Sequence, residues 1–558
     1  MLAFVSTYIV LTLLYMKRKF WGLATLLGGY LILSQVAQAQ NSYVDNALLY
    51  MRQNPSGTAR TLGLGGAGST LGADFGNLTS NPAGLGFYTK SELTFTPGLG
   101  YGKTNSGQVA NAVAQGTSFP EQTQTANSFH VANAGMVFTS RQLDSKDPRA
   151  WRSGSFALGF TRLADFNQAI DYQATTDDNH SLFQLLREPN RQTDYTSADY
   201  QSAAHKIVQQ STDSRTAGNS QYNNLDGLAY GTGLTTQVTV LNPHTGSAKG
   251  DSIHRLATPA RSGNITQHEL VESKGSLSQF NLGYGGNFRN KLYIGGTIGI
   301  VSMNRTRTST FSEESNASQD IVLQDDVKTM GTGFNARLGL IYRVDNALRV
   351  GASIQTPTFL KLNDLHSTTL TNVKFPVTGD STALSTMPNT VVYDVTLPFR
   401  ATGGATLLLG KYGLLTGDVE YVGYSQARFK TTNGSFNANV NEGNSAITTT
   451  YRNVVNVRLG AEGKFNILRA RLGYARSANP YLNSALNRTQ NYFTAGLGVR
   501  TKFCFVDLAG VYLSARDQYQ PYTLASAEVG MPAVTRKAPT INITNNRFTA
   551  SLTLGVLF

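Results

Sequence analysis

Seven histidines are the side chains of this 558-residue chain that are best suited to acid–base catalysis or metal binding. A hydrolase would pair one of them with a serine and an orienting group, and a metal site would hold them at a ligand spacing such as HExxH. They are dispersed instead, nearly all in segments that we predict to be loops: His130, His180, His205, His244, His254, His268 and His366. We therefore expect no enzyme and no metal or cofactor site.

Charged side chains offer a second kind of chemistry, because several recur on one face of predicted strands. Between residues 412 and 429, Leu415 and Val419 share one face while Asp418 and Glu420 share the other. Residues of this kind either hold a polar plug in a lumen or bind a ligand carboxylate, and both roles stay open. The full set is Arg337, Asp418, Glu420, Arg458, Glu462, Arg469 and Arg471.

The first 39 residues have the order of a secretory signal peptide. A basic start at Met16–Lys19 precedes an apolar run at 20–33 and the small residues of Ala37-Gln38-Ala39. We expect cleavage before Gln40 and Met16 as the true start, and the alternative is an uncleaved membrane anchor. The net charge is +13 and falls to +10 without the three basic residues of this leader. The remaining positive residues are scattered, which favours a surface near anionic lipid headgroups over nucleic acid.

The composition favours strands over helices. Glycine is frequent (55 residues), aromatic residues make up 10% and charged residues only 15%, with a mean hydropathy of −0.21. The single cysteine, Cys504, excludes an internal disulfide framework. Period-two alternation predicts about fourteen strands. They are 91–101, 126–140, 153–164, 275–288, 291–311, 326–343, 346–359, 390–409, 412–429, 451–465, 467–478, 490–502, 503–515 and 546–558.

The connections between these strands alternate between tight and long. Tight ones include Arg289-Asn290, Gly410-Lys411 and Asn466. The long ones are 102–125, 165–274, 312–325, 360–389, 430–450, 479–489 and 516–545. Short turns at one end and long loops at the other are typical of an outer-membrane barrel. The last strand ends on Phe558, which is how such barrels usually present their assembly signal, so we expect the barrel assembly machinery as a partner.

A glycine-rich stretch at 63–87, and above all Ser80-Asn81-Pro82-Ala83-Gly84, fits neither a helix nor a strand. It closes a turn-rich segment of about fifty residues that precedes the first strand. We predict that residues 40–89, the hatch segment, form a stopper, while residues 90–558 form the barrel. The alternative is that these residues are ordinary turns.

Taken together, the hatch segment and the strands resemble the FadL/TodX family of outer-membrane transporters for hydrophobic compounds, in particular its Bacteroidetes-type subgroup. The likeness is carried by the stretch 63–87, by Gly351–Pro357, by Val395–Pro398 and by Val419–Tyr424. It implies an all-β membrane protein: a fourteen-stranded antiparallel transmembrane barrel with its hatch inside the lumen. It also implies that Asn81, Pro82 and Ala83 form a hatch turn, continued by Gly84, which approaches a kink in the wall. Ligand would pass from a groove in the loops through an internal pocket and sideways into the membrane.

The 165–274 insertion is too long for an idle loop, so we expect structure within it. Ser181 and Gln184 fit a capping box, and residues 200–208 have helical spacing. Helices here would either expose apolar faces as a docking groove or cover those faces against each other. The groove residues would be Leu182, Phe183, Leu185 and Leu186.

We expect passive uptake of hydrophobic molecules, such as long-chain fatty acids or aromatic hydrocarbons, across the outer membrane. The partners would be the hydrophobic ligand, outer-membrane lipid and lipopolysaccharide. The alternatives are a haem or iron receptor, which would use a histidine or tyrosine ligand, and a diffusion porin or structural surface barrel, which would need no hatch.

Overall fold

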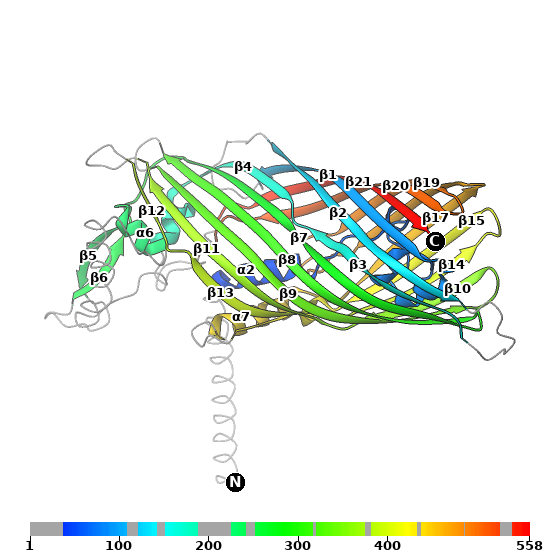
Figure 1. The fold of residues 1–558 in the computed structure, drawn as a ribbon. Coiled ribbons are helices and arrows are strands. Elements are labelled where there is room, and N and C mark those ends of the chain that lie inside the picture. The colour runs from blue at the N-terminus through cyan, green and yellow to red at the C-terminus, as the bar shows by residue number, and fades with distance from the viewer. Residues whose placement is uncertain are drawn as a thin grey trace, which may run out of the picture.

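The computed structural model describes residues 37–108, 121–141, 151–187, 225–241, 252–315, 320–373, 381–431, 437–484, 486–524 and 538–558. These residues build one closed antiparallel barrel of fourteen strand positions (Figure 1). Each position hydrogen-bonds to its neighbours in the sequence, and the first strand closes the barrel on the last through pairs such as Leu93 with Val556. In a membrane this arrangement satisfies the backbone without leaving an edge.

Four of the fourteen positions are divided into shorter strands: β3 with β4, β10 with β11, β12 with β13 and β14, and β15 with β16. The strands of the barrel are β1 (Glu92–Gln108), β2 (Gln122–Arg141), β3 (Trp151–Asp165), β4 (Gln168–Thr176), β7 (Ile265–Phe288), β8 (Leu292–Ser315), β9 (Ile321–Arg343), β10 (Leu348–Gln355), β11 (Thr358–Asn372), β12 (Thr382–Ser385), β13 (Asn389–Leu397), β14 (Arg400–Leu408), β15 (Gly413–Val422), β16 (Arg428–Lys430), β17 (Val454–Phe465), β18 (Leu468–Ser477), β19 (Gln490–Arg500), β20 (Cys504–Tyr519) and β21 (Ile541–Leu557).

The fourteen predicted strands are confirmed, but several extend much farther than the sequence indicates. β7 begins at Ile265 rather than 275, and β4 lies inside the segment that we predicted as the loop 165–274. β8, β9 and β11 likewise run into the predicted loops 312–325 and 360–389. The apolar alternation stops where a strand leaves the membrane, because both of its faces then meet polar surroundings. The remaining ladder is invisible to a search for that pattern.

The outer surface carries an apolar band bordered by aromatic side chains. Ile298 and Leu338 are 62% and 64% exposed within the band. Aromatic pairs lie along its border on the side of the long loops. They include Phe334 with Phe359 and Phe399 with Tyr421, with ring centroids 5.4 and 5.6 Å apart. Exposed Trp151, Tyr412 and Phe503 lie along the other border. An apolar belt between two aromatic girdles is the surface that a barrel presents to a bilayer. In the described residues, no helix is both long and apolar enough to cross a membrane.

Tight turns gather at one end of the barrel, the turn end. Arg289 and Asn290 both have positive φ (57° and 54°), as the two central residues of a type I′ hairpin turn require. Gly410 and Asn466 also have positive φ, at 58° and 56°. The predicted tight connections are therefore confirmed. The C-terminal residue joins this end too, since Phe558 and Ser91 exchange two backbone hydrogen bonds of 3.0 Å.

The opposite end, the loop end, carries the insertion between β4 and β7. It contains η3 (Asp178–His180), α4 (Leu182–Arg187), α6 (Leu225–Gly231) and the hairpin of β5 (Thr236–Leu241) and β6 (Ser252–Ala257). These elements extend beyond the wall of the barrel (Figure 1).

The hatch segment lies inside the barrel, packed against its inner wall. It comprises α2 (Ala37–Met51), α3 (Ala59–Gly63), η1 (Phe75–Leu78) and η2 (Pro82–Phe87). α2 lies in the lumen beside α7 (Asn437–Thr450), which falls inside the predicted loop 430–450 (Figure 1). α2 runs continuously across the expected cleavage position before Gln40. The basic and apolar parts of the predicted signal peptide lie outside the described residues.

Candidate functional site: hatch, wall seam and internal cavities

The buried side-chain amide of Asn81 joins the hatch turn to the wall. Asn81 is fully buried, and its Nδ2 donates to the carbonyls of Leu340 on β9 (3.3 Å) and Ala352 on β10 (3.2 Å). Its Oδ1 accepts a hydrogen bond from the backbone of Ala83 (3.1 Å), which caps η2, and Pro82 occupies the first helical position. The Asn81 side chain therefore joins the start of η2 to two strands of the barrel.

Glycines in the wall allow this close approach. A Cβ on Gly295 would lie 2.3 Å from the carbonyl oxygen of Pro82, and one on Gly339 would lie 1.9 Å from Oδ1 of Asn81. Gly84 meets the same limit within the hatch segment, since its Cβ would lie 2.4 Å from the side-chain amide carbon of Asn77. The backbone of the turn and the wall are in contact with no room for a side chain between them.

The turn and the Phe75 side chain lie against different parts of the wall. Asn81–Gly84 lies against β7, β8, β9 and β10, whereas Phe75 of η1 faces the paired glycines Gly135 of β2 and Gly159 of β3. A Cβ on Gly135 or Gly159 would lie 2.3 or 2.6 Å from the Phe75 ring. The hatch segment thus contacts the wall closely at two places, through the turn at one and through the Phe75 ring at the other.

We expect the change Gly295→Ala to unseat the hatch turn, because the new methyl group would meet the backbone of Pro82 rather than a movable side chain. The melting temperature should fall by several degrees, corresponding to about 1–3 kcal/mol. Gly403→Ala is the matched control, since a Cβ on Gly403 of β14 meets nothing within 4 Å. Equal melting temperatures for the two variants would contradict this account.

Most of the predicted inward charges do face the lumen, and three of them hold the hatch segment. Asp418 accepts two hydrogen bonds from Ser69, from its Oγ at 2.6 Å and its backbone nitrogen at 3.0 Å. Arg337 donates to the Ser80 carbonyl at 3.0 Å. Glu462 lies 3.6 Å from Arg60 of α3. These contacts support the plug-holding role among the two that the sequence left open.

The other predicted charges pair along the wall. Glu420 pairs with Arg458 (2.8 Å) and Arg400 (3.4 Å), and Arg471 bridges Glu462 (2.7 Å) and Asp507 (2.5 Å). Arg400 and Asp507 were missed, because nothing in the alternation of a single strand shows which charges meet across strands. Arg469 takes no part in these charge pairs. It donates to the carbonyls of its own turn, at Asn466 and Leu468, and contacts neither the hatch segment nor an acidic partner.

The wall has a gap in its backbone ladder between β2 and β4, which we call the β2/β4 seam. The β2–β3 ladder ends at the pair Asn133 with Thr161, and β4 then pairs only with β7. Across the seam, side chains replace backbone bonds, as when Gln124 Nε2 donates to Asp171 at 2.9 Å. The exposed Phe129 and Tyr101 lie farther toward the loop end than this last pair. The seam therefore begins within the apolar band.

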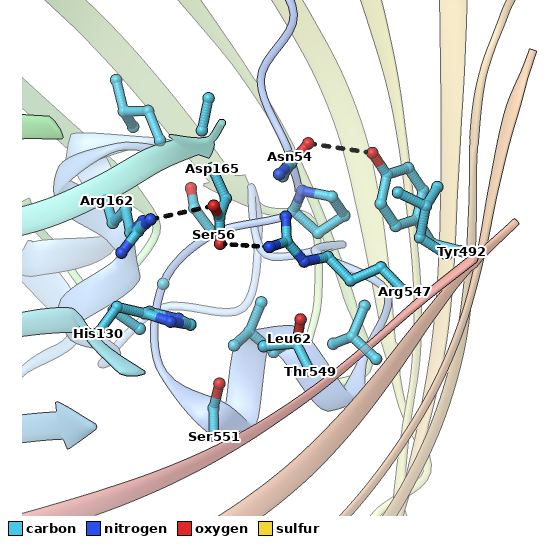
Figure 2. Close-up of a pocket in the computed structure, with 17 residues that line it drawn as sticks. Asn54, Ser56, Leu62, His130, Arg162, Asp165, Tyr492, Arg547, Thr549 and Ser551 are labelled. Atoms are coloured by element: carbon cyan, nitrogen blue, oxygen red, sulfur yellow. Dashed lines mark hydrogen bonds and ion pairs between the residues drawn. The ribbon is translucent and has the colours of Figure 1, made fainter. Parts of the chain in front are cut away.

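A polar cavity of about 80 Å³ lies inside the barrel beside this seam (Figure 2). Its centre is Asp165, which pairs with Arg162 of β3 and Arg547 of β21, each at 3.1 Å. On its far side, the hydroxyl of Tyr492 donates to Asn54 of the hatch segment at 3.2 Å. The space is large enough for several water molecules or a small polar head group.

Several buried polar atoms around this cavity have no hydrogen-bond partner among the described residues. They are Nδ1 of His130, Nε of Arg162, Nε of Arg547 and Oγ of Ser551. Buried groups of this kind are normally satisfied, so unsatisfied ones indicate bound water or a ligand. Two guanidinium groups face one carboxylate, which gives the cavity an excess of positive charge. Apolar residues complete the lining: Leu62, Leu163, Val511 and Leu513.

The sequence did not reveal this cavity. Arg547 stands out on the polar face of the last strand, but its contact with Arg162 and Asp165 exists only because the last strands close on the first ones. His130 is the only histidine among the described residues that line it, and it lies on β2, within the predicted strand 126–140. Among the described residues, no group of three or more histidine, cysteine or acidic side chains could hold a metal ion.

On the side of the cavity toward the loop end, α2 and the inner wall form a buried apolar cluster, which we call the apolar chamber and which α2 occupies. Val44, Leu48 and Met51 of α2 belong to one continuous buried cluster that reaches around most of the inner wall. The wall residues of this apolar chamber include Leu163, Phe166, Leu277, Val301, Met303, Leu360, Leu362, Val395, Val422 and Phe429. Few polar contacts hold the helix there: Arg400 donates to the Met51 carbonyl, and Tyr451 donates to the Val44 carbonyl at 2.8 Å.

The four loop residues predicted as a groove are buried. Leu182, Phe183, Leu185 and Leu186 are 3%, 0%, 8% and 5% exposed, and they pack with α6 and with the upper ends of β8, β9 and β11. Ser181 accepts a hydrogen bond from the backbone of Gln184 at 3.4 Å, as the capping pattern predicts. Of the two arrangements considered, the covered one describes α4. The second predicted helix, 200–208, lies outside the described residues.

A closed barrel with an apolar belt, aromatic girdles and its leading segment in the lumen defines the class: this is a β-barrel protein of the Gram-negative outer membrane. No protein-family model matches the sequence, and no curated protein matches it.

Among solved structures, the chain is similar to the toluene transporter TodX of P. putida at 14% identity, covering 90% of this chain and 99% of that one, with a TM-score of 0.46. A FadL homologue of Pseudomonas aeruginosa gives 11% identity, 90% and 98% coverage and a TM-score of 0.46. The Ralstonia pickettii toluene transporter TbuX is 14% identical, with 90% of this chain and 99% of that one covered and a TM-score of 0.43.

Proposed function

We propose that this protein is a FadL/TodX-type transporter that takes up hydrophobic small molecules passively across the outer membrane. The solved structures are too distant to carry this assignment. The observation that carries it is the apolar chamber, which is enclosed in the barrel and continuous with residues Leu163, Ala164 and Phe166 at the β2/β4 seam. An oily molecule in this chamber would be separated from the hydrocarbon of the membrane only by a wall that lacks a backbone ladder.

Transport along this path needs no external energy source. Each methylene that leaves water contributes about 0.8 kcal/mol, so a molecule with a long alkyl chain enters an apolar chamber spontaneously. On passing from the chamber into lipid its methylenes stay out of water, so this step costs little. The hatch segment would keep the turn end closed to water and ions meanwhile, so that only molecules able to leave sideways could complete the passage.

The polar cavity favours cargo with an acidic head within the proposed class. Arg162, Arg547 and His130 offer unsatisfied donors beside the apolar chamber. A fatty acid could place its carboxylate there and its chain among the α2 contacts. A plain aromatic hydrocarbon would use the apolar surface alone.

The alternatives fit these features less well. A diffusion porin needs an open aqueous lumen, whereas α2, η1 and η2 occupy the lumen here. A haem receptor needs an axial ligand facing a planar cavity. His130 and Tyr492 both line the polar cavity, but about 80 Å³ is much too small for a porphyrin.

The test is uptake of labelled oleate and labelled toluene by a transporter-null host that carries this protein. We expect the change Ala132→Phe, which fills the polar cavity beside the seam, to lower oleate uptake about tenfold without loss of folding. Ala352→Phe, on the exposed outer face of β10, is the control and should leave uptake unchanged. Equal uptake by the null and complemented hosts would remove the transport proposal.

A further inference from the structure

The wall contains a second gap, at the junction of β15, β16 and β17. The β15–β17 ladder ends at the pair Val422 with Val454. Farther toward the loop end, β16 pairs with β13 on one side only. The helix α7 occupies the place that a continuation of β17 would take. We call this gap the α7 seam.

The α7 seam lies opposite the β2/β4 seam. Seven of the fourteen strand positions separate the two in either direction around the barrel. The two seams also begin at different distances from the loop end. The α7 seam begins one residue beyond Tyr421, which belongs to the aromatic girdle nearer the loop end. The outward side chains of α7 are polar and exposed: Asn441, Ser445, Thr448 and Thr449. This seam therefore faces the polar layer above the hydrocarbon rather than the hydrocarbon itself.

Side-chain hydrogen bonds replace the missing ladder at the α7 seam, among them that of Ser425 to Asn453 (2.9 Å). The amide of Asn444 accepts a hydrogen bond from the Phe429 backbone nitrogen and donates one to the Phe429 carbonyl, both at 2.8 Å. The inward face of α7 contributes Val440, Ala446 and Ile447 to the apolar chamber, in the same cluster as α2. A helix that the Asn444 amide joins to β16 thus forms the wall of the chamber at this point.

The sequence of α7 makes a weak helix. It contains four asparagines, one glycine and three consecutive threonines at its end, all of which are poor helix formers. The hydroxyls of Ser445, Thr448 and Thr449 donate to carbonyls one turn earlier, a contact that destabilises and bends helices. Its stability must come from contacts with α2 and β16, so losing them should cost the helix its shape.

From these contacts we infer that α7 is a displaceable wall segment and that the α7 seam is a side port through which apolar molecules enter the chamber from the polar layer. This inference rests on the proposed function. It adds a point of access in the wall, distinct from the loop end and from the β2/β4 seam. Cargo would cross the barrel from one seam to the other, along the surface that α2 now covers.

The first arm of the test measures opening without any transport. Ile447 is fully buried, so we would place a cysteine there in a Cys504→Ser background, which removes the exposed native thiol. A membrane-impermeant maleimide then reports how often α7 opens in intact cells. Asn444→Ala should speed labelling about tenfold, since it removes two hydrogen bonds. Asn441→Ala, on the exposed face of the same helix, should leave the rate unchanged.

The second arm measures uptake of labelled oleate with α7 pinned. Tyr451 and Tyr481 form an antiparallel bridge at the end of α7, so a cysteine pair there can form a disulfide. We expect oxidation to lower uptake about tenfold and reduction to restore it. A cysteine pair at Tyr421 and Val455, partners just below the seam, is the control and should not change uptake.

The outcomes separate the two proposals. Equal labelling rates for the Asn444→Ala and Asn441→Ala chains would overturn the port, whatever uptake does. Faster labelling with equal uptake by the two oxidised pairs would also overturn it, because α7 would then open without admitting cargo. If the unpinned chain takes up no oleate, the proposed function fails, and the labelling arm alone decides whether α7 opens.

Discussion

Reversing the charge of Arg547 should separate acidic from neutral cargo. In an Arg547→Glu chain we expect oleate uptake to fall about tenfold or more, because a charge-assisted hydrogen bond is worth about 1.5–3 kcal/mol and would become a repulsion. Toluene carries no acidic group and should be taken up at nearly the unaltered rate. Competition between labelled oleate and unlabelled toluene in the same host measures both effects.

The control for this prediction is Arg476→Glu, which makes the same change of net charge at an exposed position on β18. It should leave both cargoes unaffected. If Arg547→Glu lowers oleate and toluene uptake equally, the arginine supports the barrel and does not select the head group. If it lowers neither, the polar cavity is not on the path.

Removing Asp165 should have the largest effect on stability. This carboxylate pairs with Arg162 and Arg547 and also accepts hydrogen bonds from Asn167, at 2.9 Å from the backbone and 2.5 Å from the side chain. An Asp165→Ala chain would leave two buried guanidinium groups without their carboxylate, and breaking a buried ion pair in this way costs about 3–5 kcal/mol. The shift of the folded barrel's melting temperature on a gel measures the loss.

A second change keeps this prediction testable. Arg547→Leu added to Asp165→Ala removes one of the stranded charges and should recover part of the lost stability. A double variant no more stable than Asp165→Ala would show that the loss comes from the turn at Asn167 and not from the charges. Asp345→Ala at an exposed turn is a suitable reference for the loss of a carboxylate.

The barrel itself was predictable because the membrane imposes a simple rule on each spanning strand. Residues 548–558 alternate so regularly that apolar side chains face lipid while Arg547, Thr549 and Ser551 face inward. The turns were predictable for a similar reason, since positive φ at Arg289 and Asn290 follows from a two-residue connection. Both properties are local, and a single strand or turn is enough to reveal them.

The path that we propose for transport could not be predicted from the sequence, because it depends on contacts between distant parts of the chain. The β2/β4 seam follows from where the β2–β3 ladder ends, and that register leaves no mark on either strand alone. The region 430–450 was predicted as a loop because asparagine, threonine and glycine dominate it. In the structure α7 forms there, held by contacts with α2 and β16. The four apolar loop residues, Leu182, Phe183, Leu185 and Leu186, were predicted as an exposed groove. They are buried instead, because the strands they pack against extend beyond the membrane.

The pairing of Ser91 with Phe558 has a consequence for biogenesis. The first and last strands of the barrel are paired with each other, so the barrel cannot close before the last residue has been synthesised. The hatch segment precedes the first strand and carries the Asn81 contacts with β9 and β10, deep within the ring. The hatch segment must therefore lie in the lumen before the first and last strands pair, because the closed barrel has no opening wide enough to admit it.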